Sequence, residues 1–243
     1  MNDTCRQLHW AVQAVAGVGR SLLMRQPDDS HSNLAWSRTH RAFVNSNTLD
    51  DGTRGGLRLR DLTLLVIKDR GLIEDEFPLR GKTIDDAFGF FESRFGKCVR
   101  QPNAEEALPY APPAMFDANA DDLVKLDRLY DDADRVLNTY RSKRENTSEV
   151  RCWPHHFDIA TLQTFDDGRT IGAGFLPGDA QIHEPYWYVT PNPYPENRDA
   201  FAPLPLGYWN KDPWFGAVLT GEHSREEVLR FLETASDAIE PVA

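Results

Sequence analysis

Residues 151–175 read RCWPHHFDIATLQTFDDGRTIGAGF, and this stretch decides the predicted fold. Two runs, 151–165 and 169–175, contain the β-branched and aromatic residues that favour strands. Between them, Asp166-Asp167-Gly168 is typical of a tight hairpin turn, because glycine adopts a left-handed backbone conformation without steric penalty. A hairpin pairs its strands in opposite directions, so the stretch predicts an antiparallel sheet.

Further strands are expected on both sides of this hairpin. The run 57–68 becomes continuously apolar, as a central strand does, and 72–79 follows it after the short turn Asp69-Arg70-Gly71. The remaining predicted strands are 42–45, 186–190 and 214–219. Strands joined by such short turns favour antiparallel pairing.

Apolar residues at helical spacing predict four helices, over about residues 4–24, 83–95, 121–143 and 224–239. Thr83 and Ser224 are expected to cap two of them, and Glu227 completes a capping box with Ser224. In the first helix, Gly17 and Gly19 are expected to let another backbone approach closely. The order helix, strands, helix occurs twice. We therefore expect an α+β fold, mainly antiparallel sheet packed by about four helices, in an order that two similar halves would produce.

One segment, 100–119, is rich in proline and is typical of a linker or a long surface loop. We expect a single compact domain over residues 1–243. If the chain is subdivided, the predicted parts are 1–99 and 120–243, joined by this segment.

The composition limits the partners. The chain of 243 residues carries 38 acidic and 27 basic side chains, for a net charge of -11. This charge argues against nucleic acid or an anionic membrane as the main partner, and no run is apolar enough to span a bilayer. No signal peptide is recognisable at the start, and the three widely spaced cysteines do not form a disulfide framework. We expect a cytoplasmic protein whose partner is a small-molecule ligand.

Side chains able to do chemistry are concentrated between residues 153 and 188. In a continuous strand, His156 and Asp158 would share one face, because side chains alternate. A His-x-Asp pair supplies two metal ligands, and His183, Glu184 or the distant His223 would supply a third. The expected cofactor of that version is a divalent transition metal bound by His156, Asp158 and His183. Without a metal, His156 or Glu184 would be the acid–base catalyst, and Asp158 would orient the histidine.

Aromatic residues beside these groups indicate a possible ligand-binding wall. Tyr186 and Tyr188 would lie on one face of their strand and Trp187 on the other. These three side chains, with His155 and His31, are the predicted ligand-binding residues for a sugar or an aromatic molecule. Structural roles stay open as alternatives, because aromatics at strand spacing usually fill a core and a His–Asp pair often only satisfies hydrogen bonds.

Three elements of the sequence resemble a bacterial family of uncharacterised proteins, a domain of unknown function. They are Trp153-Pro154-His155-His156-Phe157-Asp158, Pro177-Gly178-Asp179 and Glu184-Pro185-Tyr186. The segment 28–34 is also similar to part of such proteins, and the resemblance covers most of the chain. The resemblance supplies no catalytic roles, because it implies no known activity.

Three functional hypotheses follow. The first is a soluble enzyme acting on a small molecule through His156, Asp158 and Glu184, with or without a metal. The second is a non-catalytic protein that binds a small molecule or sugar in an aromatic-lined pocket. The third is a structural or interaction protein in which the polar groups only satisfy one another. The first hypothesis requires His156 and Asp158 to share a cavity.

Overall fold

The computed structural model describes residues 2–26, 28–103 and 108–240. Over these residues the chain forms four α-helices and eleven strands, and the strand pairs are antiparallel. The predicted α+β class is therefore confirmed. The chain divides into two compact units. The amino-terminal unit comprises residues 2–131 and 151–157, and the carboxyl-terminal unit comprises 132–150 and 158–240.

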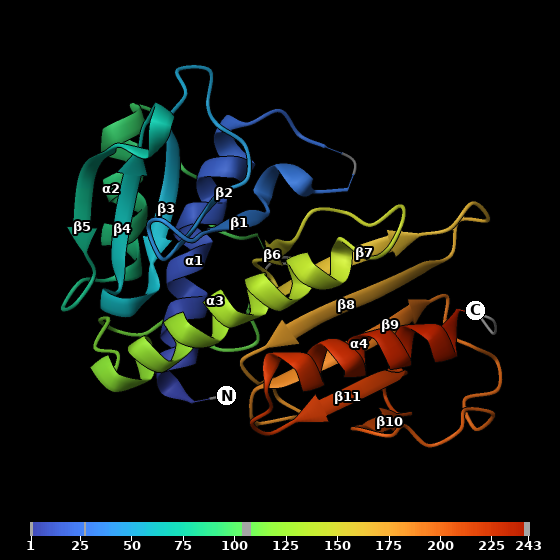
Figure 1. The fold of residues 1–243 in the computed structure, drawn as a ribbon. Helices are drawn as coiled ribbons and strands as arrows, with labels where there is room; N and C mark the ends of the chain where they lie inside the picture. The colour runs from blue at the N-terminus through green and yellow to red at the C-terminus, as the bar shows by residue number, and fades with distance from the viewer. Residues whose placement is uncertain (1, 27, 104–107, 241–243) are drawn as a thin grey trace. The chain divides into compact units, whose positions relative to one another are not determined.

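In the amino-terminal unit, six strands pair in the order β6-β1-β2-β3-β4-β5 (Figure 1). The strands are β1 (Leu34–Ser37), β2 (Ala42–Asn45), β3 (Arg54–Arg58), β4 (Thr63–Ile67), β5 (Ile73–Pro78) and β6 (Arg151–Trp153). Helix α1 (Asp3–Leu22) packs against β2, β3 and α2 (Ile84–Phe95). Strand β6 comes from late in the sequence and joins β1 where Cys152 lies opposite Leu34.

Helix α1 forms the centre of the amino-terminal unit. Its residues Leu8, Val12, Val15 and Val18 recur every three or four positions and are fully buried. This spacing places them along one side of a helix, and burying each large apolar side chain contributes about 1.5–3 kcal/mol. The Asn2 side chain accepts a hydrogen bond from the backbone N–H of Cys5 and caps the helix.

The single strand expected over 57–68 is wrong. The chain leaves β3 at Arg58, passes through a 3₁₀ helix at Leu59–Asp61, and enters β4 only at Thr63. Leu62 adopts a left-handed conformation with φ of 52° between the two strands. Leu59 in this turn is fully buried. The apolar run over 57–68 therefore arises because the turn is buried together with the two strands that it joins.

In the carboxyl-terminal unit, five strands pair in the order β7-β8-β9-β11-β10 (Figure 1). They are β7 (Asp158–Thr164), β8 (Thr170–Leu176), β9 (Tyr186–Asn192), β10 (Tyr208–Asn210) and β11 (Gly216–Thr220). Helix α4 (Arg225–Ile239) packs against β8, β9 and β11. The predicted hairpin is confirmed: Thr164 lies opposite Thr170, and Gly168 in the turn has φ of 84°. The capping boxes at Thr83 and Ser224 are both present.

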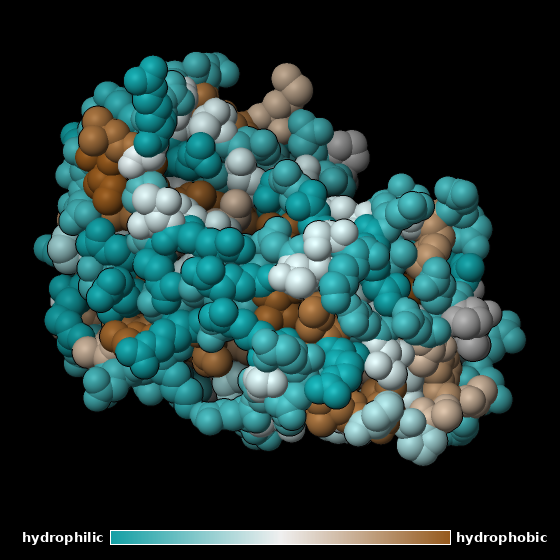
Figure 2. Space-filling view, viewed as in Figure 1, coloured by the Kyte–Doolittle hydropathy of each residue, from teal (hydrophilic) through white to brown (hydrophobic). Residues whose placement is uncertain are grey.

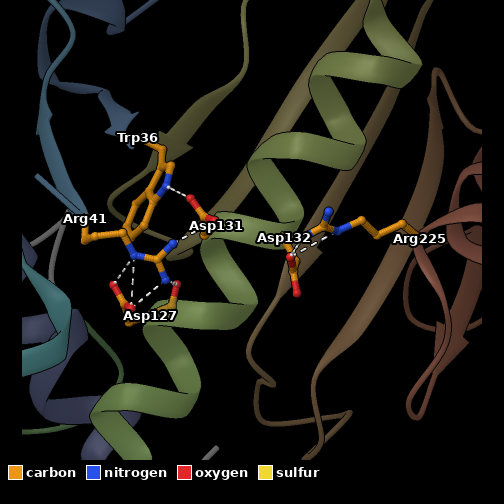
Figure 3. Close-up of polar contacts among 6 residues, drawn as sticks. All are labelled: Trp36, Arg41, Asp127, Asp131, Asp132 and Arg225. Carbon is orange, nitrogen blue, oxygen red and sulfur yellow. Dashed lines mark hydrogen bonds and ion pairs between the residues drawn. The ribbon is translucent and has the colours of Figure 1, made fainter. Parts of the chain in front are cut away.

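Helix α3 (Ala120–Arg141) contributes its aspartates to both units. Within the amino-terminal unit, the Arg41 guanidinium pairs with Asp127 at 2.6 Å and with Asp131 at 2.7 Å (Figure 3). Asp131 also accepts a hydrogen bond from the indole N–H of Trp36. These two carboxylates are almost fully buried, so Arg41 supplies the positive charge that makes their burial tolerable.

No helix in the described parts of the chain combines the length and apolar character needed to cross a membrane. The face drawn in Figure 2 is mostly hydrophilic, and its apolar residues form small separate patches.

Candidate functional site

The residues predicted to form one site are divided between the units. The amino-terminal unit contains His31, His155 and His156. The carboxyl-terminal unit contains Asp158, His183, Glu184, Tyr186, Trp187 and Tyr188. Within residues 2–26, 28–103 and 108–240, no three His, Cys, Asp or Glu side chains are grouped so that they could hold a metal ion. The described residues therefore lend no support to a divalent metal at His156, Asp158 and His183.

The continuous strand expected over 151–165 is wrong. Strand β6 ends at Trp153, and the chain turns through residues 154–157 before β7 begins at Asp158. The backbone N–H groups of His156 and Phe157 both donate to the carbonyl oxygen of Trp153, at 3.1 and 2.8 Å. Proline lacks the N–H that a strand ladder needs, which explains the break after Trp153. Strand alternation therefore does not place His156 and Asp158 on one face.

Helix α1 fixes the start of this turn through two polar side chains. The Pro154 carbonyl oxygen accepts hydrogen bonds from His9 Nε2 at 2.7 Å and from Gln13 Nε2 at 2.6 Å. The Tyr110 hydroxyl donates to Nδ1 of His9, so the ring is neutral and both of its nitrogens are used. Burial lowers the pKa of His9 to about 4, because the charged ring would lose its hydration. His9 is therefore a buried structural histidine.

The far end of the turn is held as firmly. Phe157 is fully buried, adopts φ of 60°, and stacks on the His9 ring with a centroid separation of 5.2 Å. Its carbonyl oxygen accepts a hydrogen bond of 2.7 Å from the Tyr130 hydroxyl of α3. With both ends anchored, the turn presents His155 and His156 outward as exposed side chains.

His155 lines a cavity of about 690 Å³ within the amino-terminal unit. The lining residues come from α1, the segment after it, the segment after α2, and the β6 turn. They are Gln13, Arg20, Ser21, Arg25, Asp29, His31, Ser32, Cys98, Arg100, Asn103, Trp153, Pro154 and His155. The structure thus brings the predicted residues His31 and His155 to one cavity, whereas His156 is not among the residues that line it.

Two glycines of α1 allow the walls of this cavity to approach the helix. A Cβ on Gly19 would lie 2.2 Å from the carbonyl oxygen of His31. A Cβ on Gly17 would lie 3.0 Å from the carbonyl oxygen of Arg100. Both separations are too short for ordinary contact, so the expectation that these glycines admit another backbone is confirmed. Both neighbouring segments contribute residues to the cavity.

Polar contacts orient the cavity's side chains. Arg20 donates from Nη1 to Oε1 of Gln13 and from Nη2 to the Gln13 carbonyl oxygen, at 3.3 and 3.0 Å. His31 Nδ1 accepts the backbone N–H of Gln26 at 3.2 Å, so in the neutral ring the proton is on Nε2. A hydrogen bond to the Glu92 carboxylate raises the pKa of the Cys98 thiol, which disfavours a thiolate nucleophile here.

A second cavity, of about 630 Å³, lies within the carboxyl-terminal unit and is shallow. Arg141, Arg144 and Leu162 are among its lining residues. The Arg144 guanidinium pairs with Asp237 and lies 3.6 Å from a Glu240 carboxylate oxygen. Because Arg144 already has two carboxylate partners, this second cavity is the weaker candidate for a binding site.

In the carboxyl-terminal unit, the predicted tyrosines bind carboxylates of the same unit. The Tyr188 hydroxyl donates to Asp158 and the Tyr186 hydroxyl donates to Asp179, each at 2.6 Å. Burial, with the negative charge of Asp158 nearby, raises the pKa of Tyr188 well above its usual value. Tyr186 and Trp187 are 3% and 8% exposed, so both side chains lie in the interior. His183 and Glu184 are exposed.

Sequence reasoning missed the arginines of the larger cavity. Arg20, Arg25 and Arg100 lie in segments without a motif. They line one cavity because the segment after α2 approaches α1 at Gly17. The one usable signal was the glycine pair in α1, which indicated a close approach without saying which segment approaches.

No family model matches the chain, and no curated protein or solved structure matches it either.

Proposed function

We propose that this protein binds a small molecule in the cavity lined by His31 and His155. The observation that carries the proposal is their convergence: two histidines from distant segments border one cavity of about 690 Å³. Cavities of roughly 300–1,000 Å³ are the usual size of small-molecule sites. The anchored turn supports the proposal further, because a preorganised side chain loses little conformational entropy when a ligand binds.

The test is a thermal-shift screen of small molecules against the wild type and two matched variants, His155→Ala and His156→Ala. These neighbours are exposed on the same turn, but only His155 lines the cavity. A ligand at a hundred times its Kd stabilises the folded protein by about 2.7 kcal/mol. We expect His155→Ala to weaken that stabilisation and His156→Ala to retain it. A screen without any stabilising compound, or hits equally affected by both variants, would contradict the proposal.

Catalysis at this cavity is the second candidate, because His31 and His155 both line it and the imidazole ring is the side chain that enzymes use most often as a general acid or base. Asp29 is the carboxylate among the lining residues, and Cys98 is disfavoured as a nucleophile. An acid–base role for His155 predicts turnover of a bound ligand by wild type that His155→Gln abolishes. Product analysis by mass spectrometry checks this, and binding without turnover would leave the protein a binding protein.

A further inference from the structure

Among the described residues that line the cavity, basic side chains outnumber acidic ones, whereas the chain as a whole is acidic. Its lining contains three arginines, Arg20, Arg25 and Arg100, and one carboxylate, Asp29. The whole chain has 38 acidic and 27 basic side chains, so arginine is concentrated here against the general composition. Concave surfaces lined by one sign of charge raise the local concentration of oppositely charged solutes.

The three arginines come from different segments: Arg20 from α1, Arg25 from the segment after α1, and Arg100 from the segment after α2. Arg20 is tied to its own helix by two hydrogen bonds to Gln13. The backbone N–H of Arg100 donates to Ser21 Oγ at 2.7 Å, which attaches the segment after α2 to the end of α1. Arg25 is exposed and forms no ion pair with any residue that the structure describes.

Neutral donors accompany these cations. The His31 side chain is only 6% exposed, and its Nδ1 is occupied by the Gln26 N–H. The neutral ring therefore carries its proton on Nε2, and among the described residues no acceptor takes that proton. The side-chain amide of Asn103, which also lines the cavity, carries two N–H donor groups.

From this set of groups we infer that the ligand carries an oxyanion, a phosphate or a carboxylate, held by Arg20, Arg25 and Arg100 with His31 as a neutral donor. The guanidinium fork matches the paired oxygens of both anions, and such charge-assisted hydrogen bonds are among the stronger ones. The inference rests on the proposed small-molecule site and specifies its substrate class.

The experiment measures binding of sodium phosphate and sodium succinate by calorimetry, at constant ionic strength maintained with sodium chloride. The two anions distinguish a phosphate ligand from a carboxylate ligand. The variants are Arg25→Ala and Arg60→Ala, which remove one positive charge each from an exposed position of the same unit. Arg25 lines the cavity, and Arg60 is not among its lining residues.

We expect at least one anion to bind the wild type and Arg60→Ala alike, with affinity at least tenfold weaker in Arg25→Ala. Equal affinity in the two variants would overturn the inference. Binding of neutral screen compounds alone, sensitive to His155→Ala, would overturn the anion inference and leave the proposed function intact. Absence of binding by anions and screen compounds alike would overturn both.

Discussion

The cavity of the amino-terminal unit and the tyrosine–aspartate pairs of the carboxyl-terminal unit use similar polar residues in different ways. Around the cavity, His31 and His155 border open space. In the other unit, Asp158 accepts a hydrogen bond from the half-buried Tyr188, and Asp179 accepts one from the buried Tyr186. The sequence is rich in reactive residue types near both arrangements, but the first is the one that lines the cavity of about 690 Å³. A candidate site is therefore better identified by the space beside polar groups than by their number.

The largest expected effect concerns His9, which anchors the turn beside the cavity. Its folded pKa of about 4 lies below the ordinary 6.5. The unfolded chain therefore binds the proton first, and stability falls as the pH drops from about 6.5 towards 4. The loss reaches about 3 kcal/mol, from 1.36 kcal/mol per pKa unit. Urea unfolding at several pH values measures it.

The control for this prediction is His9→Gln, which removes the titrating ring and keeps a donor and an acceptor. The difference in unfolding free energy between wild type and variant should shrink as the pH falls through this window, because carboxylate titrations are common to both proteins. A constant difference would show that His9 is not held neutral by the fold.

The next largest effect is expected for Gly19→Ala, because the new methyl group would meet the carbonyl oxygen of His31 at 2.2 Å. We expect a destabilisation of about 2 kcal/mol by overpacking and weakened ligand binding. Gly89→Ala in α2 is the matched control, since nothing lies within 4 Å of its added Cβ. That variant should be neutral or up to about 1 kcal/mol more stable. Chemical denaturation of both variants decides the comparison, and equal behaviour would contradict it.

A smaller effect is expected from Tyr188→Phe, which removes the hydroxyl bonded to the buried Asp158 carboxylate. We expect a loss of about 1–2 kcal/mol in unfolding free energy, because that carboxylate loses a donor. Ligand affinity at the cavity should not change. Tyr208→Phe, at a tyrosine that is 46% exposed, is the control and should cost little. A loss of ligand affinity in Tyr188→Phe would contradict the view that the tyrosine–aspartate pairs are structural and separate from ligand binding at the cavity.

The smallest effect is expected for His183→Ala. The side chain is exposed, and its Nδ1 lies 3.2 Å from the Asp179 carbonyl oxygen. We expect a stability change within about 0.5 kcal/mol and unchanged ligand binding. Loss of a bound metal or of an activity in this variant would instead restore the first sequence-based hypothesis.

Local rules predicted the parts of the fold that local residues determine. The turn at Asp166-Asp167-Gly168, the helix cap at Thr83 and the capping box at Ser224 depend on a few neighbouring residues, and all three are present. The strands over 57–68 and 151–165 were predicted without their interruptions. In both cases the interrupting turn contains a buried residue with positive φ, Leu62 or Phe157, that local preference disfavours.

The candidate site was predictable only in part, because the cavity is a tertiary feature. Two of its residues, His31 and His155, were predicted from residue type. Arg20, Arg25 and Arg100 become neighbours through the close approaches at Gly17 and Gly19, and the sequence does not state which backbones fill those gaps. Predicting such a site from sequence alone requires the packing partners, which residue periodicity does not provide.

The position of Cys98 makes the cavity open to site-specific chemical labelling. Cys5 and Cys152 are buried and Cys98 is exposed, so a maleimide fluorophore should modify the native protein at one sulfur atom. Cys98 is among the residues that line the cavity, so an occupied cavity should slow the modification. The raised pKa of the thiol makes the labelling slow at neutral pH and faster under mildly alkaline conditions. A fluorophore attached to Cys98 of the native chain would therefore report whether the cavity is occupied.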